Sequence, residues 1–339
     1  MTKYRKRAEF ANFVCHFGNK DLLDYLEEIV IPAFTSGLER TYGEERMFFH
    51  DTKVINLKDE KDEPELAIAG RFVVDTKITR SQIFSNEDIV PSPGSLEVAL
   101  SSFFVLTLRD HKLVYVKEVS HAPGLAKFKS TAANFLKRSR DAYINQIYEK
   151  CKLDYAFGGI SERVTKKSLM ESIDAPDLKI LELPGKGSLG AFIRQFKIIS
   201  SVQVRMIKPN SEIDNSKLFQ KLRVVNQHLD SDVTTITYRN KEGLRKSRVE
   251  DELDAALDGN SELVLTGKRE DGSKLNGSNK DFTIFVPIDI IPREVRNAAR
   301  MLTNLLKSLI SKGTLSVAKT DGKAENEEKL NELARNIEQ

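Results

Sequence analysis

The side chains in this sequence whose number and spacing indicate a function are lysine and arginine, because clustered cations bind polyanions. Residues 124–248 carry 24 basic and 13 acidic side chains, a net charge of +11. The segments before and after this block are each net −4, so the whole chain of 339 residues is only +3. A basic block between acidic ones predicts a polyanionic partner, and chance fluctuation of charge along a long chain is the alternative.

The basic side chains are densest between residues 239 and 248, where five fall within ten positions. The pattern predicts that this connection ends at the start of a helix, where free backbone amides also favour phosphate. We therefore predict contacts with the DNA backbone that depend on salt and are largely independent of base sequence. The predicted contact residues are Arg194, Lys197, Arg205, Lys208, Lys217, Lys221, Arg223, Arg239, Lys241, Arg245, Lys246 and Arg248, together with Lys137, Arg138 and Arg140 on an earlier helix.

Other nucleotide-binding signatures do not fit the sequence. Residues 185–190, Gly-Lys-Gly-Ser-Leu-Gly, lack the Gly-Lys-Ser/Thr ending of a Walker A loop and predict a flexible linker instead. The chain has no tryptophan, no zinc-finger spacing and no aromatic RNA-recognition motif. Reading of individual bases is therefore not predicted.

Catalytic signatures are equally missing from the sequence. There is no G-x-S-x-G elbow, and Glu262 and Lys268 are too far apart for an acid-x-Lys strand end. Cys15 and His16 are neighbours that point to opposite faces of a strand, and His111 is predicted to face solvent in a turn. We predict a protein without enzymatic activity, metal or cofactor. Two alternatives stay open, a nuclease whose metal site is dispersed in sequence and a sensor that binds an acidic protein.

The pattern of apolar residues predicts an α+β fold with two domains, at residues 1–155 and 191–315. Residues 156–190 are predicted to link them, and residues 316–339 form a polar tail. In the first domain we expect a mixed sheet covered by a long amphipathic helix. Its predicted elements are strands at 9–17, 66–74, 103–108 and 113–119, helices at 19–32 and 125–147, a loop at 51–65 and a break at 91–95.

The second domain is predicted to be a β-α-β-α-β-β-α sandwich. Its predicted strands are 192–207, 233–238, 263–267 and 282–286, with turns at Asp271-Gly272 and Asn276-Gly277. The predicted helices are 216–229, 247–257 and 294–311. The last has an unbroken apolar stripe from Val295 to Ile310, which must be buried either on the domain's own sheet or against its twin in a dimer.

Composition also bears on the compartment. No apolar run approaches the length of a membrane span, the basic start leads into no hydrophobic signal core, and the chain has only two cysteines, Cys15 and Cys151. These features predict a protein of the reducing cytoplasm.

Two segments resemble the A-protein family of the lambda Rex phage-exclusion system. One is residues 102–124, a strand, turn and strand ending at Pro123-Gly124, followed by a helix through Phe135-Leu136. The other is residues 202–210, where a strand ends in Ile207-Lys208-Pro209 before a lysine-rich helix. The resemblance covers the order of elements over about two-thirds of the chain, which is longer than the family and has an acidic tail.

This resemblance implies sequence-independent DNA binding, self-association and a role in blocking phage growth, with a membrane protein encoded alongside as partner. Lys208 is the one basic position that the resemblance assigns. The other predicted contact residues rest on charge alone. The predicted protein is thus a cytoplasmic, homodimeric DNA-binding protein of phage exclusion or antiviral defence.

Overall fold

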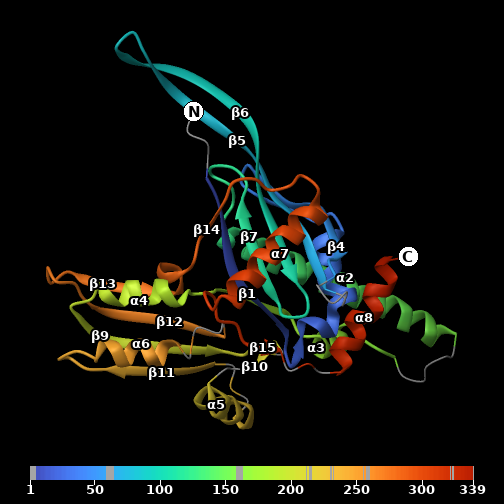
Figure 1. The fold of residues 1–339 in the computed structure, drawn as a ribbon. Coiled ribbons are helices and arrows are strands. Elements are labelled where there is room, and N and C mark those ends of the chain that lie inside the picture. The colour runs from blue at the N-terminus through green and yellow to red at the C-terminus, as the bar shows by residue number, and fades with distance from the viewer. Residues whose placement is uncertain are drawn as a thin grey trace.

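The computed structural model confirms the α+β class. It describes residues 5–58, 65–157, 163–210, 212–213, 216–229, 231, 233–254, 256, 260–320, 322 and 324–338. A large sheet is covered by helices on both faces, and a small sheet with its own helices extends to one side (Figure 1).

The large sheet has the strand order β14-β1-β7-β6-β5-β4-β3, and β2 and β8 also pair with β1. Every pairing recorded for it is antiparallel, so the prediction of a mixed sheet is wrong. The strands are β1 (Lys6–Phe17), β2 (Lys20–Asp21), β3 (Glu39–Tyr42), β4 (Glu45–Asn56), β5 (Leu66–Ser85), β6 (Asp88–Thr107), β7 (Lys112–Lys117), β8 (Pro176–Glu182) and β14 (Val286–Ile288).

One face of the large sheet is covered mainly by the long helix α2 (Leu125–Ala156), as predicted. Phe128 and Phe135 of this helix are buried against Phe49 and Phe104 of the sheet, with ring centroids 5.1–5.7 Å apart. Shorter helices complete this layer. They are η1 (Leu22–Tyr25), η2 (Leu26–Val30), α1 (Ile31–Thr35), α3 (Lys166–Ser172) and α8 (Ala324–Glu338).

The other face is covered by α7 (Val295–Ser311). Ala298, Leu302 and Leu306 of α7 are buried against β-strand residues that include Phe10 and Phe103. The helix was predicted to close the second domain or to form a dimer seam, and both alternatives are wrong. Its stripe is buried because the large sheet has a second apolar face, which α7 covers.

The small sheet has the order β11-β9-β12-β13 and is also antiparallel. Its apolar side chains pack with helices on one face. The strands are β9 (Ile198–Ile207), β11 (Val233–Arg239), β12 (Ser261–Lys268) and β13 (Lys274–Ser278). The helices are α4 (Lys186–Arg194), α5 (Lys217–His228), α6 (Lys246–Asp254) and η3 (Asn279–Phe282). Because β8 and β14, on either side of this unit in sequence, both pair with β1, the predicted linker 156–190 and domain 191–315 do not coincide with the packed units.

Several local predictions fail where pairing overrides a turn signal. Residues 91–95 lie within β6 and do not break the chain, because β5 pairs along almost its whole length with β6. Asn276-Gly277 lies in β13, residues 51–56 continue β4, and residues 192–194 belong to helix α4. The predicted helix at 19–32 is three short helical segments that continue past Pro32. The hairpin at 103–119 and the Asp271-Gly272 turn are confirmed.

The tail forms more structure than its polarity indicates. Leu330, Leu333 and Ala334 of α8 are buried in the same cluster as α2. The strand β15 (Lys319–Thr320), which precedes α8, pairs with β10 (Glu212–Ile213). No helix among the described residues is long and apolar enough to cross a membrane.

The buried stripe of α7 generates the first prediction. Leu302 is fully buried, so Leu302→Ala leaves a cavity in the core and should lower the free energy of unfolding by about 3 kcal/mol. Asn304→Ala, on the exposed side of the same helix, should change it by less than about 0.5 kcal/mol. Urea denaturation followed by circular dichroism measures both values. Equal effects of the two substitutions would contradict the packing of this helix on the sheet.

Candidate nucleic-acid interface

The topology of the small sheet brings basic side chains from separate segments to one end. β9 begins there, β11 and β12 end there, and β13 begins there, as their registers show. α4 ends beside it and α6 begins beside it. This end points away from the large sheet (Figure 1). We call it the distal basic end and define it by nine residues. They are Arg194, Lys197, Arg239, Lys241, Arg245, Arg248, Lys268, Arg269 and Lys274.

Backbone hydrogen bonds fix the connections of this end. The Lys197 amide donates to the Lys268 carbonyl over 2.7 Å, and the Leu244 amide donates to the Ile199 carbonyl over 2.8 Å. The ammonium of Lys246 donates to the Phe196 carbonyl. Lys246 therefore fastens the start of α6 to the end of α4 and is not placed to contact a ligand.

The nine side chains of the distal basic end are exposed. Among the described residues no acidic partner lies within ion-pair distance of Arg239, Lys241 or Arg245. Lys197 approaches Glu270 at 3.6 Å and Arg248 approaches Asp251 at 3.8 Å, with more than half of each side chain exposed. Such exposed pairs contribute little, so these cations also remain available to an anion.

Sequence reasoning missed three residues of this end, Lys268, Arg269 and Lys274. They lie on the β12–β13 hairpin, outside the basic block. Only the register of β12 on β9, which pairs Lys268 with Ile198, brings them beside Lys197. The sequence contains no local signal for that pairing.

Four predicted contact residues lie elsewhere on the small unit. Arg205 lies mid-strand on the face without helices and pairs with Glu262 at 3.2 Å. Lys217 and Lys221 are exposed on α5. The guanidinium of Arg223 donates to the carbonyls of Ile207 and Asn260, which gives this arginine a structural role.

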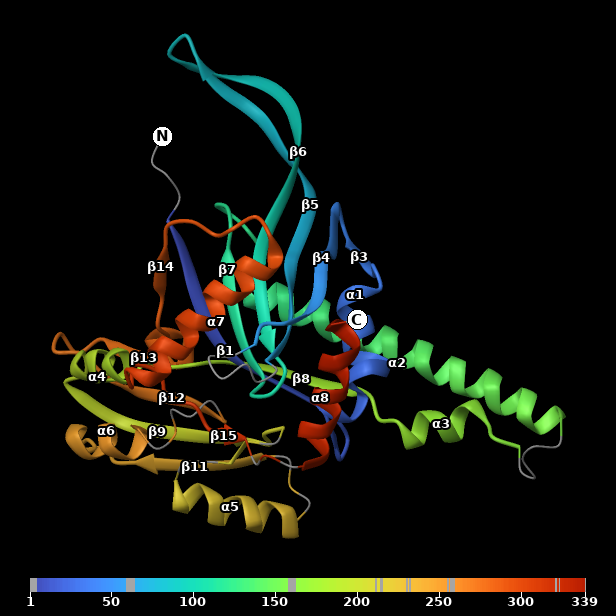
Figure 2. The same cartoon turned by 45° about the vertical axis from the view of Figure 1, so that its right-hand side comes forward.

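The basic residues predicted on α2 do not join the interface. Figure 2 shows α2 on the opposite side of the molecule from α4 and α6. Arg140 is buried, and its guanidinium donates to the carbonyls of Met170 and Ile173, so its predicted exposure is wrong. Arg138 donates to the Glu39 carbonyl, and Lys137 is exposed.

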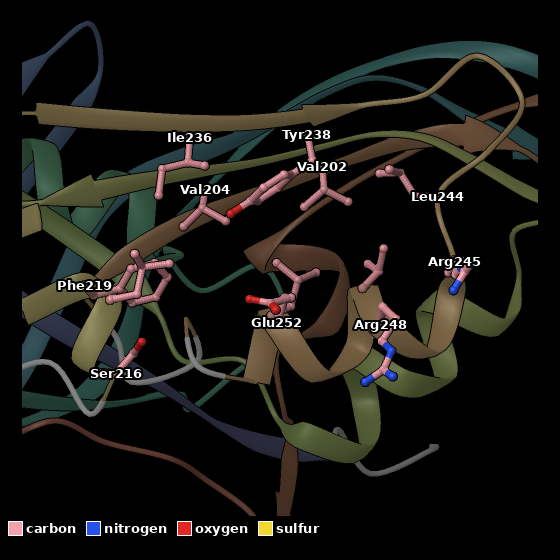
Figure 3. A pocket seen from close by; sticks show the side chains of 13 residues that line it. Val202, Val204, Ser216, Phe219, Ile236, Tyr238, Leu244, Arg245, Arg248 and Glu252 are labelled. Atoms are coloured by element: carbon pink, nitrogen blue, oxygen red, sulfur yellow. The ribbon is translucent and has the colours of Figure 1, made fainter.

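A groove of about 400 Å³ lies beside the distal basic end, between the helix-covered face of β9 and β11 and helix α6. Figure 3 shows Val202, Val204, Ile236 and Tyr238 on the strand side, with arginines of α6 and its preceding turn opposite. Arg245 and Arg248 line one end of the groove. Its walls are thus mainly apolar, with cations at one end.

Residues 185–190 begin helix α4 and form no linker, and Gly185 and Gly190 lie close to neighbouring side chains. Gly185 caps α4, and Gly190 lies where α4 meets α6. A Cβ on Gly190 would come within 2.4 Å of the Glu250 carboxylate, so a larger residue would displace this side chain. Among the described residues no group of three or more His, Cys, Asp or Glu side chains could hold a metal ion.

The opposite, proximal end of the small sheet is fixed to β1. Asn210, after β9, donates from its side-chain amide to the Phe13 carbonyl over 3.0 Å and accepts from the Cys15 amide over 2.9 Å. On this edge the pairing of β1 with β7 stops at Asn12. The Asn210 amide therefore takes the place of a neighbouring strand. Lys208 donates to the Gly18 carbonyl over 3.3 Å, so it holds the joint and does not face a ligand.

A buried charge cluster completes this joint. The Glu212 carboxylate lies 3.3 Å from His111 Nδ1 and 3.6 Å from the Lys112 ammonium, and all three side chains are almost fully buried. His111 was predicted to face solvent, which is wrong, because its side chain is buried against Glu212, a residue about 100 positions later in the sequence. Burial raises the pKa of Glu212, but the hydrogen bond with His111 and the charge of Lys112 outweigh burial and hold the pKa at about 2.

The chain matches no protein-family model and no curated protein. The class of this protein is therefore defined by the fold and site of the chain itself. The chain is an α+β protein that carries a basic cluster on the free end of a small sheet.

The cluster at the joint generates the second prediction. A carboxyl whose pKa is lowered by folding stabilises the native state above pH 4.5, and this contribution is lost as the pH falls to about 2. Glu212→Gln should therefore lower the free energy of unfolding at pH 7 by about 3 kcal/mol, since it leaves Lys112 buried without a counterion. It should also flatten the fall in stability between pH 4.5 and 2. Urea denaturation at several pH values measures both effects, and an unchanged pH profile would contradict this role.

Proposed function

We propose that this protein binds DNA independently of sequence through the distal basic end, without catalysing a reaction. The observation that carries the proposal is the gathering of nine exposed cations from three segments, 194–197, 239–248 and 268–274, onto one free end of a sheet. Five acidic residues lie among these nine cations, so the net charge of the end is still positive. They are Glu242, Glu250, Asp251, Glu270 and Asp271. Backbone phosphates suit exposed, flexible cations because such contacts need no fixed geometry.

The proposal extends to a role in phage exclusion or antiviral defence, as a homodimer of the cytoplasm. The resemblance of residues 102–124 and 202–210 to the Rex A-protein family supports this role and the membrane protein as partner. A dimer would carry two distal basic ends. Once one end has bound DNA, the second is held near the same DNA, and this raises the overall affinity when each single site is weak.

A second candidate function is recognition of an acidic protein segment. The apolar groove favours it, because β11 is the edge strand of the small sheet and Arg245 and Arg248 line the end of the groove. An extended chain could place apolar side chains in the groove and a carboxylate at the arginines. Binding of heparin without any shift of DNA in a gel would favour this candidate over DNA.

The third prediction tests the distal basic end directly. Arg239→Glu, Lys241→Glu and Arg245→Glu in one chain should weaken binding to random-sequence duplex by at least about 100-fold, because each change replaces a phosphate contact by repulsion. The melting temperature should change little, since the three side chains are exposed and make no ion pair with a described residue. Fluorescence anisotropy measures the affinity.

The matched control changes the net charge equally on the opposite side of the molecule. Lys150, Lys152 and Lys167 are exposed on α2 and α3, and their replacement by Glu should alter binding less than about threefold. Equal weakening by both triple variants would mean that net charge alone, and no particular surface, governs the affinity.

The fourth prediction concerns salt. If about six phosphates are neutralised, the logarithm of the binding constant should fall with the logarithm of salt concentration at a slope near −5. The triple variant at the distal basic end should reduce the magnitude of this slope by about 3. A slope near zero for the unmodified protein would contradict binding to nucleic acid through phosphate contacts.

The nuclease alternative is tested with the same protein. Supercoiled plasmid incubated with Mg²⁺ and with Mn²⁺ should remain intact if the protein only binds. Nicking that requires the metal and persists through purification would overturn binding without catalysis.

A further inference from the structure

Four large apolar side chains are exposed on a long two-stranded arm. β4 pairs with β5 only up to Asp75, and β7 pairs with β6 only from Ser102. Residues 76–98, which we call the arm, therefore pair only with each other and project beyond the sheet (Figures 1 and 2). With a rise of about 3.3 Å per residue, the arm extends about 30 Å.

The two faces of the arm differ in character. Ile78 pairs with Leu96 and Phe84 pairs with Ile89, and because 78 and 84 are both even positions of β5, these pairs share a face. Their exposed fractions are 51%, 64%, 75% and 58% in that order. The opposite face includes Lys77 paired with Glu97 at 3.5 Å and Thr79 opposite Ser95.

An apolar face of this size requires a cover. A hairpin of two strands is marginally stable in water on its own, and these side chains expose on the order of 400 Å². On this face the two apolar pairs are separated by Arg80 and Gln82, which are the even positions between them. Exposed apolar groups of this total extent on soluble proteins commonly mark contact sites. Nothing else among the described residues of the chain pairs with the arm.

We propose that the apolar face of the arm packs against the same face of a second copy of this chain. The two apolar pairs lie at equal distances along β5 from Ser81, three residues to either side. A two-fold axis near Ser81 therefore sets Ile78 and Leu96 of one copy against Phe84 and Ile89 of the other, in both directions. An interface of a symmetric dimer requires this kind of self-complementarity.

The middle of the arm suits such an axis. Arg80 lies across Gly94, with its Nε within 3.1 Å of the position of an added Cβ, and bonds to Ser92. The guanidinium is thereby held close to the strands between the two apolar pairs. The arm carries two basic and three acidic residues, so two arms do not repel strongly. Pro91 and Pro93 lack backbone donors, which disfavours addition of a strand along β6.

The expected dimer is reversible. Two arms would bury on the order of 400 Å² per copy, about half of the area in a standard interface, so dissociation constants in the micromolar range are expected. This inference goes beyond DNA binding, and it is measured without DNA. Its failure is therefore distinguishable from failure of the distal basic end as an interface.

The fifth prediction uses sedimentation velocity over a concentration series. The unmodified protein should change from monomer to dimer, and Ile78→Thr with Phe84→Thr should shift the dissociation constant upward by at least about tenfold. Lys77→Thr with Ile83→Thr changes the opposite face of the same strand and should leave the dimer intact. Circular dichroism should show that both variants keep the fold. A monomer at all concentrations, or a dimer unaffected by the first variant, would overturn the proposal.

Mixing two variants tests the two-fold arrangement itself. Ile78→Lys alone and Phe84→Glu alone should each be monomeric, because each places a charge against an apolar side chain twice per dimer. Mixed in equal amounts they should form a heterodimer, in which the introduced charges meet once and Ile78 meets Phe84 once. A mixture that stays monomeric would contradict the axis near Ser81.

Discussion

The pairing of β1 with its neighbours is the constraint on which the rest of the structure depends. This strand holds β7 on one edge and β14 and β8 on the other, and the side chain of Asn210 takes over where β7 ends. Segments far apart in sequence are thus fixed to twelve residues near the start of the chain. The joint also contains Glu212, which is buried between His111 and Lys112, so the two units share a buried charge cluster. A buried ion pair stabilises weakly compared with apolar packing, but it tolerates few alternative arrangements.

This joint determines where the positive charge can act. The small sheet is attached at one end, and β9 carries the chain about 30 Å from β1 to the other end. The cations used near the joint, Lys208 and Arg223, bond to carbonyls, whereas the cations at the free end have few partners. The same residue types therefore have structural roles at one end of the sheet and are available to a polyanion at the other.

Sequence patterns predicted the elements whose signals are local. The hairpin of β6 and β7, helix α2 and helix α7 follow from apolar spacing over adjacent residues. Other features depend on contacts between distant segments, which periodicity does not encode. They are the register of β12 on β9, the packing of α7 on the large sheet and the burial of His111. For the candidate site, the cluster from Arg239 to Arg248 could be predicted from density of charge. Lys268, Arg269 and Lys274 could not, because their proximity follows from strand pairing alone.

The arm shows why turn residues mislead when pairing is extensive. Pro91, Pro93 and Gly94 would end an isolated strand, but β6 accommodates them with one extra residue opposite Arg80 and Gln82. The prolines then lie on an open edge, where they need no partner for a missing donor. A hairpin with no partner could carry polar residues on both faces. The apolar residues on one face, and the prolines that disfavour pairing along one edge, together favour a partner that approaches face-on. Two copies joined in this way would carry two distal basic ends on one particle, which links the exposed apolar side chains of the arm to the basic cluster of the small sheet.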